Sequence, residues 1–247
     1  MDLTPELHLE TLEQEAGRIV DLATPANLDN SVPSCPDWTM RDLVTHVGRV
    51  YNWAGTIVEG QLRDRPDGDT LPPRPDGTSA VDWLADRLDF LLDALRRTPR
   101  TAAIWNFTGR PATVEWWARR QANETIVHRV DAELAAHAVV TAVDPALAAD
   151  VTDELLEVHG FEAAELEGLD HAGDLWIHLH ATDAEGAEWT IDTGAKRFSR
   201  AHMKGDVALR GTAFALARWV TGRGSLDYLE AFGDTAAADA WRASIAF

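Results

Sequence analysis

The sequence predicts an α+β protein with two domains: a four-helix bundle over residues 1–143 and a small α+β domain over residues 144–247. The first observation is that apolar residues recur at helical spacing in four long stretches before Asp144. The second is that proline- and glycine-rich segments separate these stretches, which is typical of loops. The third is that alternating apolar and polar residues, the pattern of half-buried strands, begin after Asp144-Pro145.

The helices of the predicted bundle carry start signals and apolar stripes. Thr4-Pro5-Glu6 offers a cap with proline in the first turn, and Thr39 with Asp42 three residues later resembles a capping box. The predicted helices cover approximately residues 4–23, 40–58, 79–97 and 114–139. The loops between them, residues 27–38, 60–78 and 98–113, are too long for tight hairpins, so we expect crossover connections.

The second domain is predicted to combine helices with short strands. Residues 174–181 alternate, with His178 and His180 on the face opposite Ile177 and Leu179. A turn at residues 183–186 leads to a partner strand at residues 188–192, and residues 206–210 form another short strand. Helices are expected over residues 147–166, 212–221 and 235–243.

The composition argues against several classes of function. The chain has 247 residues, a formal net charge of −19 and a single cysteine. Such acidity argues against binding to nucleic acid or to an anionic membrane. A single cysteine rules out an intrachain disulfide and fits a reducing cytoplasm. Because the N-terminus resembles no secretory signal and the chain has no apolar run of about 18 residues, we expect a cytoplasmic protein. The sequence leaves its oligomeric state open.

A carboxylate and an imidazole lie one turn apart on the fourth predicted helix. Glu124 and His128 share a face that also carries Trp117, Gln121, Asp131 and Ala135, and the opposite face carries Arg119, Arg129, Glu133 and His137. We therefore expect Glu124 and His128 to point inward. Burying both groups costs several kcal/mol unless something compensates, and a metal ion bound by both is one compensation. A hydrogen-bonded pair is the alternative.

A third inward ligand is available on the second predicted helix. His46 shares a face with Leu43, Trp53 and Ile57, whereas Gly48 and Asn52 lie on the opposite face together with Arg41 and Glu59. Two histidines and one glutamate with an open fourth position describe a catalytic zinc site. Asp131 could orient the His128 ring. Trp53, seven residues beyond His46, is the best candidate for lining a pocket beside the metal.

Three other features compete for a functional role. His178 and His180 could bind a metal, but no third ligand is evidently directed toward them, which favours a solvated or partner-facing strand. Cys35 could be a nucleophile, although a small buried residue is the simpler interpretation. Gly222-Arg223-Gly224 is too short for a phosphate loop, which favours a helix C-cap.

Two motifs resemble those of the actinobacterial mycothiol-dependent maleylpyruvate isomerase family. The first is the run Val32–Thr39, followed by Arg41-Asp42-Leu43-Val44 and His46, and the second is Asn123-Glu124 with His128-Arg129 and Asp131. The layout is similar over nearly the whole chain. A DinB-like metal-binding four-helix bundle precedes a small C-terminal domain that ends in a Gly-Arg motif, which Gly222-Arg223 matches.

The resemblance implies that His46, Glu124 and His128 hold zinc and leave a water in the open position. Mycothiol, a low-molecular-weight thiol cofactor, would replace that water as thiolate, because a divalent metal lowers the pKa of a bound thiol. In an isomerase the thiolate adds to an activated cis double bond of a small-molecule substrate, rotation follows, and elimination gives the trans isomer. An arginine such as Arg223 would bind a substrate carboxylate in bidentate fashion, with Arg210 as its competitor.

The family is diverse, so the substrate stays open and two alternatives to the isomerase remain. In a mycothiol S-transferase the thiol adduct would be released. In a non-catalytic module the bundle would hold a metal or ligand, and the acidic C-terminal domain would meet a partner. A metal with an exchangeable water beside a deep pocket favours an enzyme, whereas a closed site of four protein ligands, or the absence of a cavity, favours the module.

Overall fold

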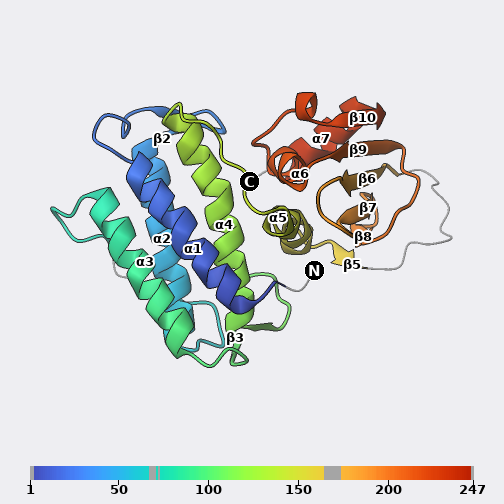
Figure 1. Ribbon diagram of the computed structural model, residues 1–247. Coiled ribbons are helices and arrows are strands. Elements are labelled where there is room, and N and C mark those ends of the chain that lie inside the picture. The colour runs from blue at the N-terminus through green and yellow to red at the C-terminus, as the bar shows by residue number, and fades with distance from the viewer. Residues whose placement is uncertain (1–2, 67–70, 72, 164–173, 246–247) are drawn as a thin grey trace. The chain divides into compact units, whose positions relative to one another are not determined.

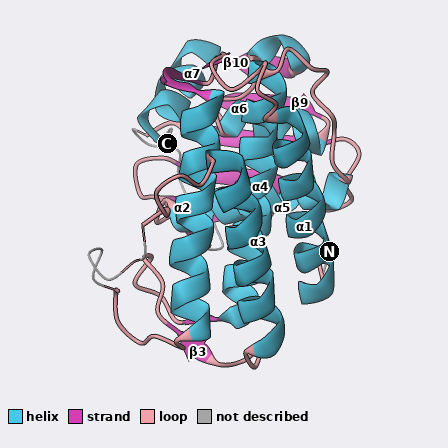
Figure 2. Ribbon diagram, turned by 90° about the vertical axis from the view of Figure 1, so that its left-hand side faces the viewer, coloured by secondary structure: helices cyan, strands magenta, loops and turns pink. Residues whose placement is uncertain are grey.

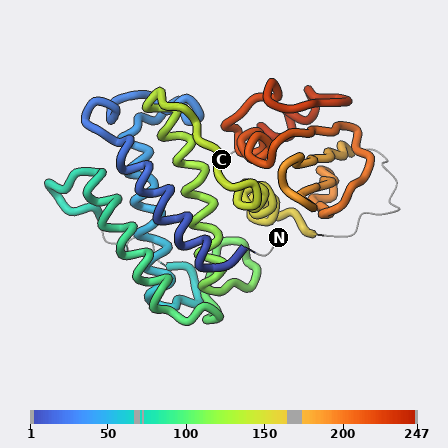
Figure 3. The backbone as a smooth tube through the Cα atoms, viewed as in Figure 1, coloured from blue at the N-terminus to red at the C-terminus, as the bar shows by residue number. Residues whose placement is uncertain are grey.

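The computed structural model describes residues 3–66, 71, 73–163 and 174–245. The chain forms two compact units, one spanning Leu3–Thr141 and the other built from Ala142 onward. Figure 1 shows long helices in the first unit and a sheet with helices in the second, and Figure 3 follows the backbone of each unit as a tube. The predicted α+β class, with a helical bundle first, is confirmed.

Four helices form the N-terminal unit: α1 (Pro5–Leu22), α2 (Met40–Glu59), α3 (Ala80–Arg97) and α4 (Val114–Ala135). The Thr4 side chain accepts a hydrogen bond from the Leu7 backbone at the start of α1. Thr39 and Asp42 form a reciprocal capping box at the start of α2. These caps satisfy backbone N–H groups that a helix leaves unpaired at its N-terminus, so both predicted starts are confirmed.

Among consecutive helices of the bundle, only α2 and α3 pack extensively on each other. α1 packs on α4, α4 on α2, α2 on α3 and α3 on α1, and Figure 2 shows α2, α3 and α4 running alongside one another. The connections from α1 to α2 and from α3 to α4 therefore cross the bundle diagonally, as the loop lengths predict. The crossover predicted between α2 and α3 is wrong, because these two helices are adjacent. The arrangement places α2 directly beside α4, the two helices that carry the candidate ligands.

Short strands lie in two segments that the sequence predicts as loops. β1 (Ser31–Val32) pairs with β2 (Cys35–Thr39), and β3 (Ala103–Ile104) pairs with β4 (Ala112–Thr113). Strands of two to five residues carry too few alternating positions for periodicity to reveal them. They end at the residues that precede α2 and α4, so each hairpin fixes the start of a ligand-bearing helix.

The predicted outward face of α2 is partly wrong. Gly48 and Asn52 are buried, because this face packs on α3. A Cβ atom added at Gly48 would lie 2.8 Å from the Trp83 ring, so glycine permits the close approach. The Asn52 amide oxygen accepts a hydrogen bond from Arg87 of α3 at 3.2 Å.

The predicted outward face of α4 also needs correction. Arg129 is 2% exposed and Glu133 is fully buried. Arg129 pairs with Glu15 of α1 at 2.6 Å and with Glu133 at 2.5 Å. α4 is therefore buried on both faces, and an ion-pair network occupies the face on which helical periodicity placed solvent. Charge alone does not mark an exposed face when the charges have partners.

The C-terminal unit is a six-stranded mixed sheet with helices. Its strand order is β10-β9-β6-β7-β8-β5, with β6 antiparallel to β7 and parallel to β9. The strands are β5 (Glu162–Ala163), β6 (Trp176–Ala181), β7 (Glu188–Asp192), β8 (Arg197–Ser199), β9 (Val207–Gly211) and β10 (Glu230–Gly233). The helices are α5 (Pro145–Val158), α6 (Ala213–Val220), η2 (Leu226–Tyr228) and α7 (Thr235–Ile245).

The core of this unit lies on one face of the sheet. Ile177 and Leu179 of β6 pack with Trp219 of α6 and Trp241 of α7. Of the predicted segments, the helix over residues 147–166 ends early, at Val158, and its last three predicted residues lie outside the described residues. β8 and β10 were not predicted, because three or four residues between turns give no clear alternation.

Candidate metal centre

Three candidate ligands from α2 and α4 converge at one place in the bundle. His46 Nε2 lies 3.8 Å from Glu124 Oε1, and His128 Nε2 lies 3.2 Å from the same oxygen. The two imidazole rings are 5.0 Å apart between centroids. One donor atom from each residue lies within 4.8 Å of the others. The packing of α2 on α4 therefore brings together the residues that the sequence could only place on separate helices.

The two oxygens of Glu124 have different partners. Oε1 faces the two histidines, whereas Oε2 forms an ion pair with Arg120, one turn earlier on α4. Burial disfavours the carboxylate, but the charges of Arg120 and His128 and the histidine hydrogen bonds outweigh it and hold the pKa of Glu124 well below its usual range. Glu124 is thus a carboxylate with one oxygen anchored and one directed at the histidines. Sequence reasoning missed Arg120, although its spacing of four residues from Glu124 was a usable signal.

The far side of the His128 ring is held by a second carboxylate. His128 Nδ1 lies 2.9 Å from Asp131 Oδ2, and the Ser34 hydroxyl donates to Asp131 Oδ1. Ser34 lies in the turn between β1 and β2, so this hairpin contacts the candidate ligands through Asp131. When His128 Nδ1–H donates to Asp131, Nε2 is the nitrogen left for a metal.

The imidazole of His128 is strongly basic in the absence of a metal. Burial favours its neutral form, but the charge of Glu124 and the hydrogen bonds to Asp131 and Glu124 outweigh burial and raise the pKa of His128 to about 9. A cation is therefore favoured between these carboxylates. A divalent metal would displace the Nε2 proton and take up the same negative charge.

The site opens toward His46. The His46 side chain is 36% exposed, compared with 8% for that of His128. Trp38 of β2 packs against the His46 ring at 4.8 Å between centroids. Two imidazoles and one carboxylate oxygen with one accessible side fit a zinc ion that keeps a fourth position for an external ligand.

Trp53 belongs to an aromatic cluster on the same two helices. Its ring lies 5.2 Å from that of Trp117 of α4, 5.9 Å from Trp105 and 6.0 Å from Phe107, between centroids. Trp53 follows His46 by seven residues and Trp117 precedes Glu124 by seven. At about 1.5 Å rise per residue, the cluster lies about 10 Å along the helices from the ligands.

Arg223 lies in the C-terminal unit, where Gly222-Arg223 ends α6. The φ angle of Gly222 is +77°, and the Arg223 N–H donates to the Arg218 carbonyl, which together form a helix C-cap. The cap interpretation is confirmed. Arg223 is 8% exposed, and its guanidinium donates to the Thr221 carbonyl at 2.6 Å. Arg210 is exposed and pairs with Glu230 at 2.9 Å.

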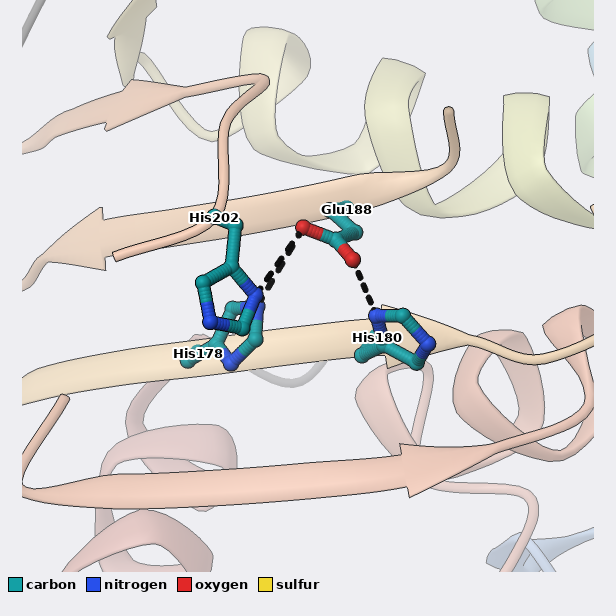
Figure 4. Close-up of side chains that lie close together, drawn as sticks. All are labelled: His178, His180, Glu188 and His202. Carbon is teal, nitrogen blue, oxygen red and sulfur yellow. Dashed lines mark hydrogen bonds and ion pairs between the residues drawn. The ribbon is translucent and has the colours of Figure 1, made fainter. Parts of the chain in front are cut away.

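The expectation that no third ligand is directed toward His178 and His180 is wrong. Glu188 of β7 and His202, in the segment after β8, lie beside them (Figure 4). The Glu188 partner follows from the register of two strands, and His202 comes from a segment that has no periodicity. The other competitor, Cys35, lies in β2 and is half-buried against the bundle core.

The fold and the converging donors define a helical-bundle protein with a candidate metal centre, joined to an α+β domain. The family model of the mycothiol maleylpyruvate isomerase N-terminal domain matches residues 9–133, and that of the corresponding C-terminal domain matches residues 146–240. The chain belongs to this family. Among the described residues, no helix is both long enough and apolar enough to span a membrane.

Two solved structures have a similar fold. One is the mycothiol-dependent maleylpyruvate isomerase, with 16% sequence identity and a TM-score of 0.56. The other is a histidine-to-alanine mutant of a protein with that name, with 15% identity and a TM-score of 0.62. In each comparison 93% of both chains is covered. No curated protein sequence matches the chain.

Proposed function

We propose that this protein is a zinc-dependent enzyme that uses mycothiol to isomerise an activated cis double bond in a small-molecule substrate. The observation that carries the proposal is the convergence of His46, Glu124 and His128 on one point with one accessible side. Family membership supports mycothiol as the thiol. Mycothiol-dependent maleylpyruvate isomerase is the name of the similar solved proteins, which makes maleylpyruvate the first substrate to test.

His46, Glu124 and His128 would hold the metal, and each has a distinct duty. Glu124 supplies one oxygen while Arg120 keeps the other occupied. His128 supplies Nε2 because Asp131, which itself accepts a hydrogen bond from Ser34, binds the opposite edge of its ring. His46 closes the third side, where its partly exposed ring packs against Trp38. A divalent metal bound there would lower the pKa of a coordinated thiol, so that the thiolate would be available near neutral pH.

The aromatic cluster and the two arginines of the C-terminal unit would serve recognition. Trp53 and Trp117 offer flat apolar faces along the bundle, suited to packing against the organic part of a bound thiol. Arg223 remains the proposed partner of a substrate carboxylate, with Arg210 as the alternative. Replacing each arginine by glutamine tests them. The substitution at the residue that binds substrate should raise KM at unchanged metal content, and the other substitution should leave KM unchanged.

An assay of the full chain with zinc, mycothiol and maleylpyruvate tests the proposed reaction. The proposal expects formation of the trans isomer with no net consumption of mycothiol. His128→Ala should abolish turnover, whereas His137→Asn, at an exposed histidine of the same unit, should leave it unchanged. Accumulation of a mycothiol conjugate would instead identify an S-transferase. Bound metal without any turnover of thiol or substrate would favour the non-catalytic module.

A further inference from the structure

A second cluster of metal-ligand side chains lies on the sheet of the C-terminal unit. His178 and His180 occupy alternate positions of β6, on the face opposite Ile177 and Leu179. Glu188 of β7 stands directly across from His180 in the antiparallel register. His202 reaches the same place from the segment between β8 and β9. Strand register and the return of the chain thus bring four candidate ligands to one sheet face.

The four side chains surround a small volume. Glu188 Oε1 contacts His180 Nδ1, and Glu188 Oε2 lies 3.3 Å from His202 Nδ1 and 3.8 Å from His178 Nε2. One donor atom from each of the four residues lies within 4.8 Å of the others. Figure 4 shows the three imidazole rings gathered around the carboxylate, with His178 and His202 at one of its oxygens and His180 at the other.

Protein hydrogen bonds do not satisfy this arrangement. The His178 side chain is 7% exposed, and its Nε2 atom is buried without a hydrogen-bond partner. The Glu188 carboxylate is the shared partner of three imidazoles. Its distance of 3.8 Å from His178 Nε2 is too long for a hydrogen bond. A buried polar atom of this kind costs free energy unless it is satisfied. A metal ion between the rings would satisfy it.

We propose that His178, His180, Glu188 and His202 form a second divalent metal site, suited to zinc, in the C-terminal unit. Three imidazoles and one carboxylate favour zinc over calcium or magnesium, which prefer oxygen ligands. Four protein ligands fill a tetrahedral zinc ion, so this site is structural. The metal would fasten the segment carrying His202 to the sheet, where the Ala201 carbonyl already accepts a hydrogen bond from Thr190.

Zinc content of the purified full chain tests this site apart from the bundle. Wild-type protein should bind about two zinc ions, and the double variant His46→Ala/His128→Ala should keep one. Adding His202→Ala to the double variant should remove it. The His202 side chain is 73% exposed, so its loss leaves the sheet core intact. Glu185→Gln, at an exposed carboxylate in the turn before β7, is the matched control for Glu188→Gln and should retain the metal.

Thermal unfolding provides the second measurement. Zinc should raise the Tm of the His46→Ala/His128→Ala variant, because a ligand that binds only the folded state stabilises it. The rise should disappear with His202→Ala or Glu188→Gln. A double variant that binds no zinc and shows no rise in Tm would overturn the second site. Loss of metal only in the sheet variants would support it and contradict the bundle site, so the two proposals fail separately.

Discussion

The two faces of α4 bury charged residues in different ways. On one face Arg129 is matched by Glu15 and Glu133, and the Glu133 carboxylate also accepts hydrogen bonds from the backbone and hydroxyl of Thr141 at 2.9 Å. On the other face Glu124 and Asp131 surround His128, and the opening lies at a half-exposed histidine. In the first network, protein groups pair with the charges of Arg129 and Glu133. The second network has an accessible side at His46, and its donor atoms are directed at one point.

The comparison shows that burial of charge does not by itself identify a functional site. Arg129 and Asp131 both belong to the motif that resembles the family's second metal motif. The structure assigns Arg129 to an ion-pair network between α1 and α4 and Asp131 to the His128 ring. A motif can therefore combine fold-stabilising and site-orienting residues. Four measurements sharpen this division.

The largest effect is expected on the closed face. Arg129→Ala removes the cation that the buried Glu133 and Glu15 carboxylates share and leaves Glu133 with the more distant Arg18, at 3.5 Å. Breaking a buried pair in this way costs about 3 to 5 kcal/mol. Urea unfolding should show this loss in the free energy of unfolding. Arg49→Ala, at an exposed arginine of α2, is the control and should stay within about 0.5 kcal/mol of wild type. Equal small effects for both variants would break the comparison.

The second effect is the pH dependence of the metal-free protein. The pKa of His128 is raised from 6.5 to about 9, so its stabilisation is fully present below pH 6.5 and is lost as the pH rises through 9. At about 1.4 kcal/mol per pKa unit, the free energy of unfolding should fall by about 3 kcal/mol across this window.

His128→Gln should lack this part of the pH dependence, and the difference between the two unfolding curves isolates it. Glu124 acts in the opposite direction: its pKa is lowered, so its contribution is present above pH 4.5 and is lost on acidification. The quantity to compare is the difference in free energy of unfolding between metal-free wild type and His128→Gln. If this difference were the same at pH 9 as at pH 6.5, the ionic environment assigned to His128 would be contradicted.

The smallest effect is expected from the residue that orients a ligand. Asp131→Asn keeps the size of the side chain but weakens its hold on the His128 ring, and such changes lower metal affinity by about 10- to 100-fold. Competition with a chelator measures the affinity. Asp21→Asn, at an exposed carboxylate of α1, should leave it unchanged. Unaltered affinity in Asp131→Asn would place Asp131 with the structural residues.

The sequence predicted the long elements and the ligand-bearing faces better than the short elements and the partners. Helical periodicity placed His46, Glu124 and His128, because each lies in a helix of 20 or more residues. It could not reveal β8 or β10, which have three and four residues. It also misassigned Arg129 and Glu133 to solvent, since their respective partners Glu15 and Arg18 lie more than 100 positions away.

The same limits explain the sheet cluster. Alternation placed His178 and His180 on one face of a strand, and the hairpin register supplies Glu188. His202 follows from neither pattern, because it reaches the cluster only after the chain has formed β8 and turned back. Tertiary structure was needed to bring the fourth ligand to the site.

The central claim is that the bundle site binds a metal and presents it to mycothiol. Cobalt(II) in place of zinc makes this visible, because coordination of a thiolate gives a sulfur-to-metal charge-transfer band. Adding mycothiol to the cobalt-substituted full chain should produce the band, in wild type and in Cys35→Ser alike. His128→Ala should not show it. His202→Ala, which affects only the sheet cluster, should show it undiminished. If cobalt remains bound and no thiol changes its spectrum, the thiol-dependent function is contradicted.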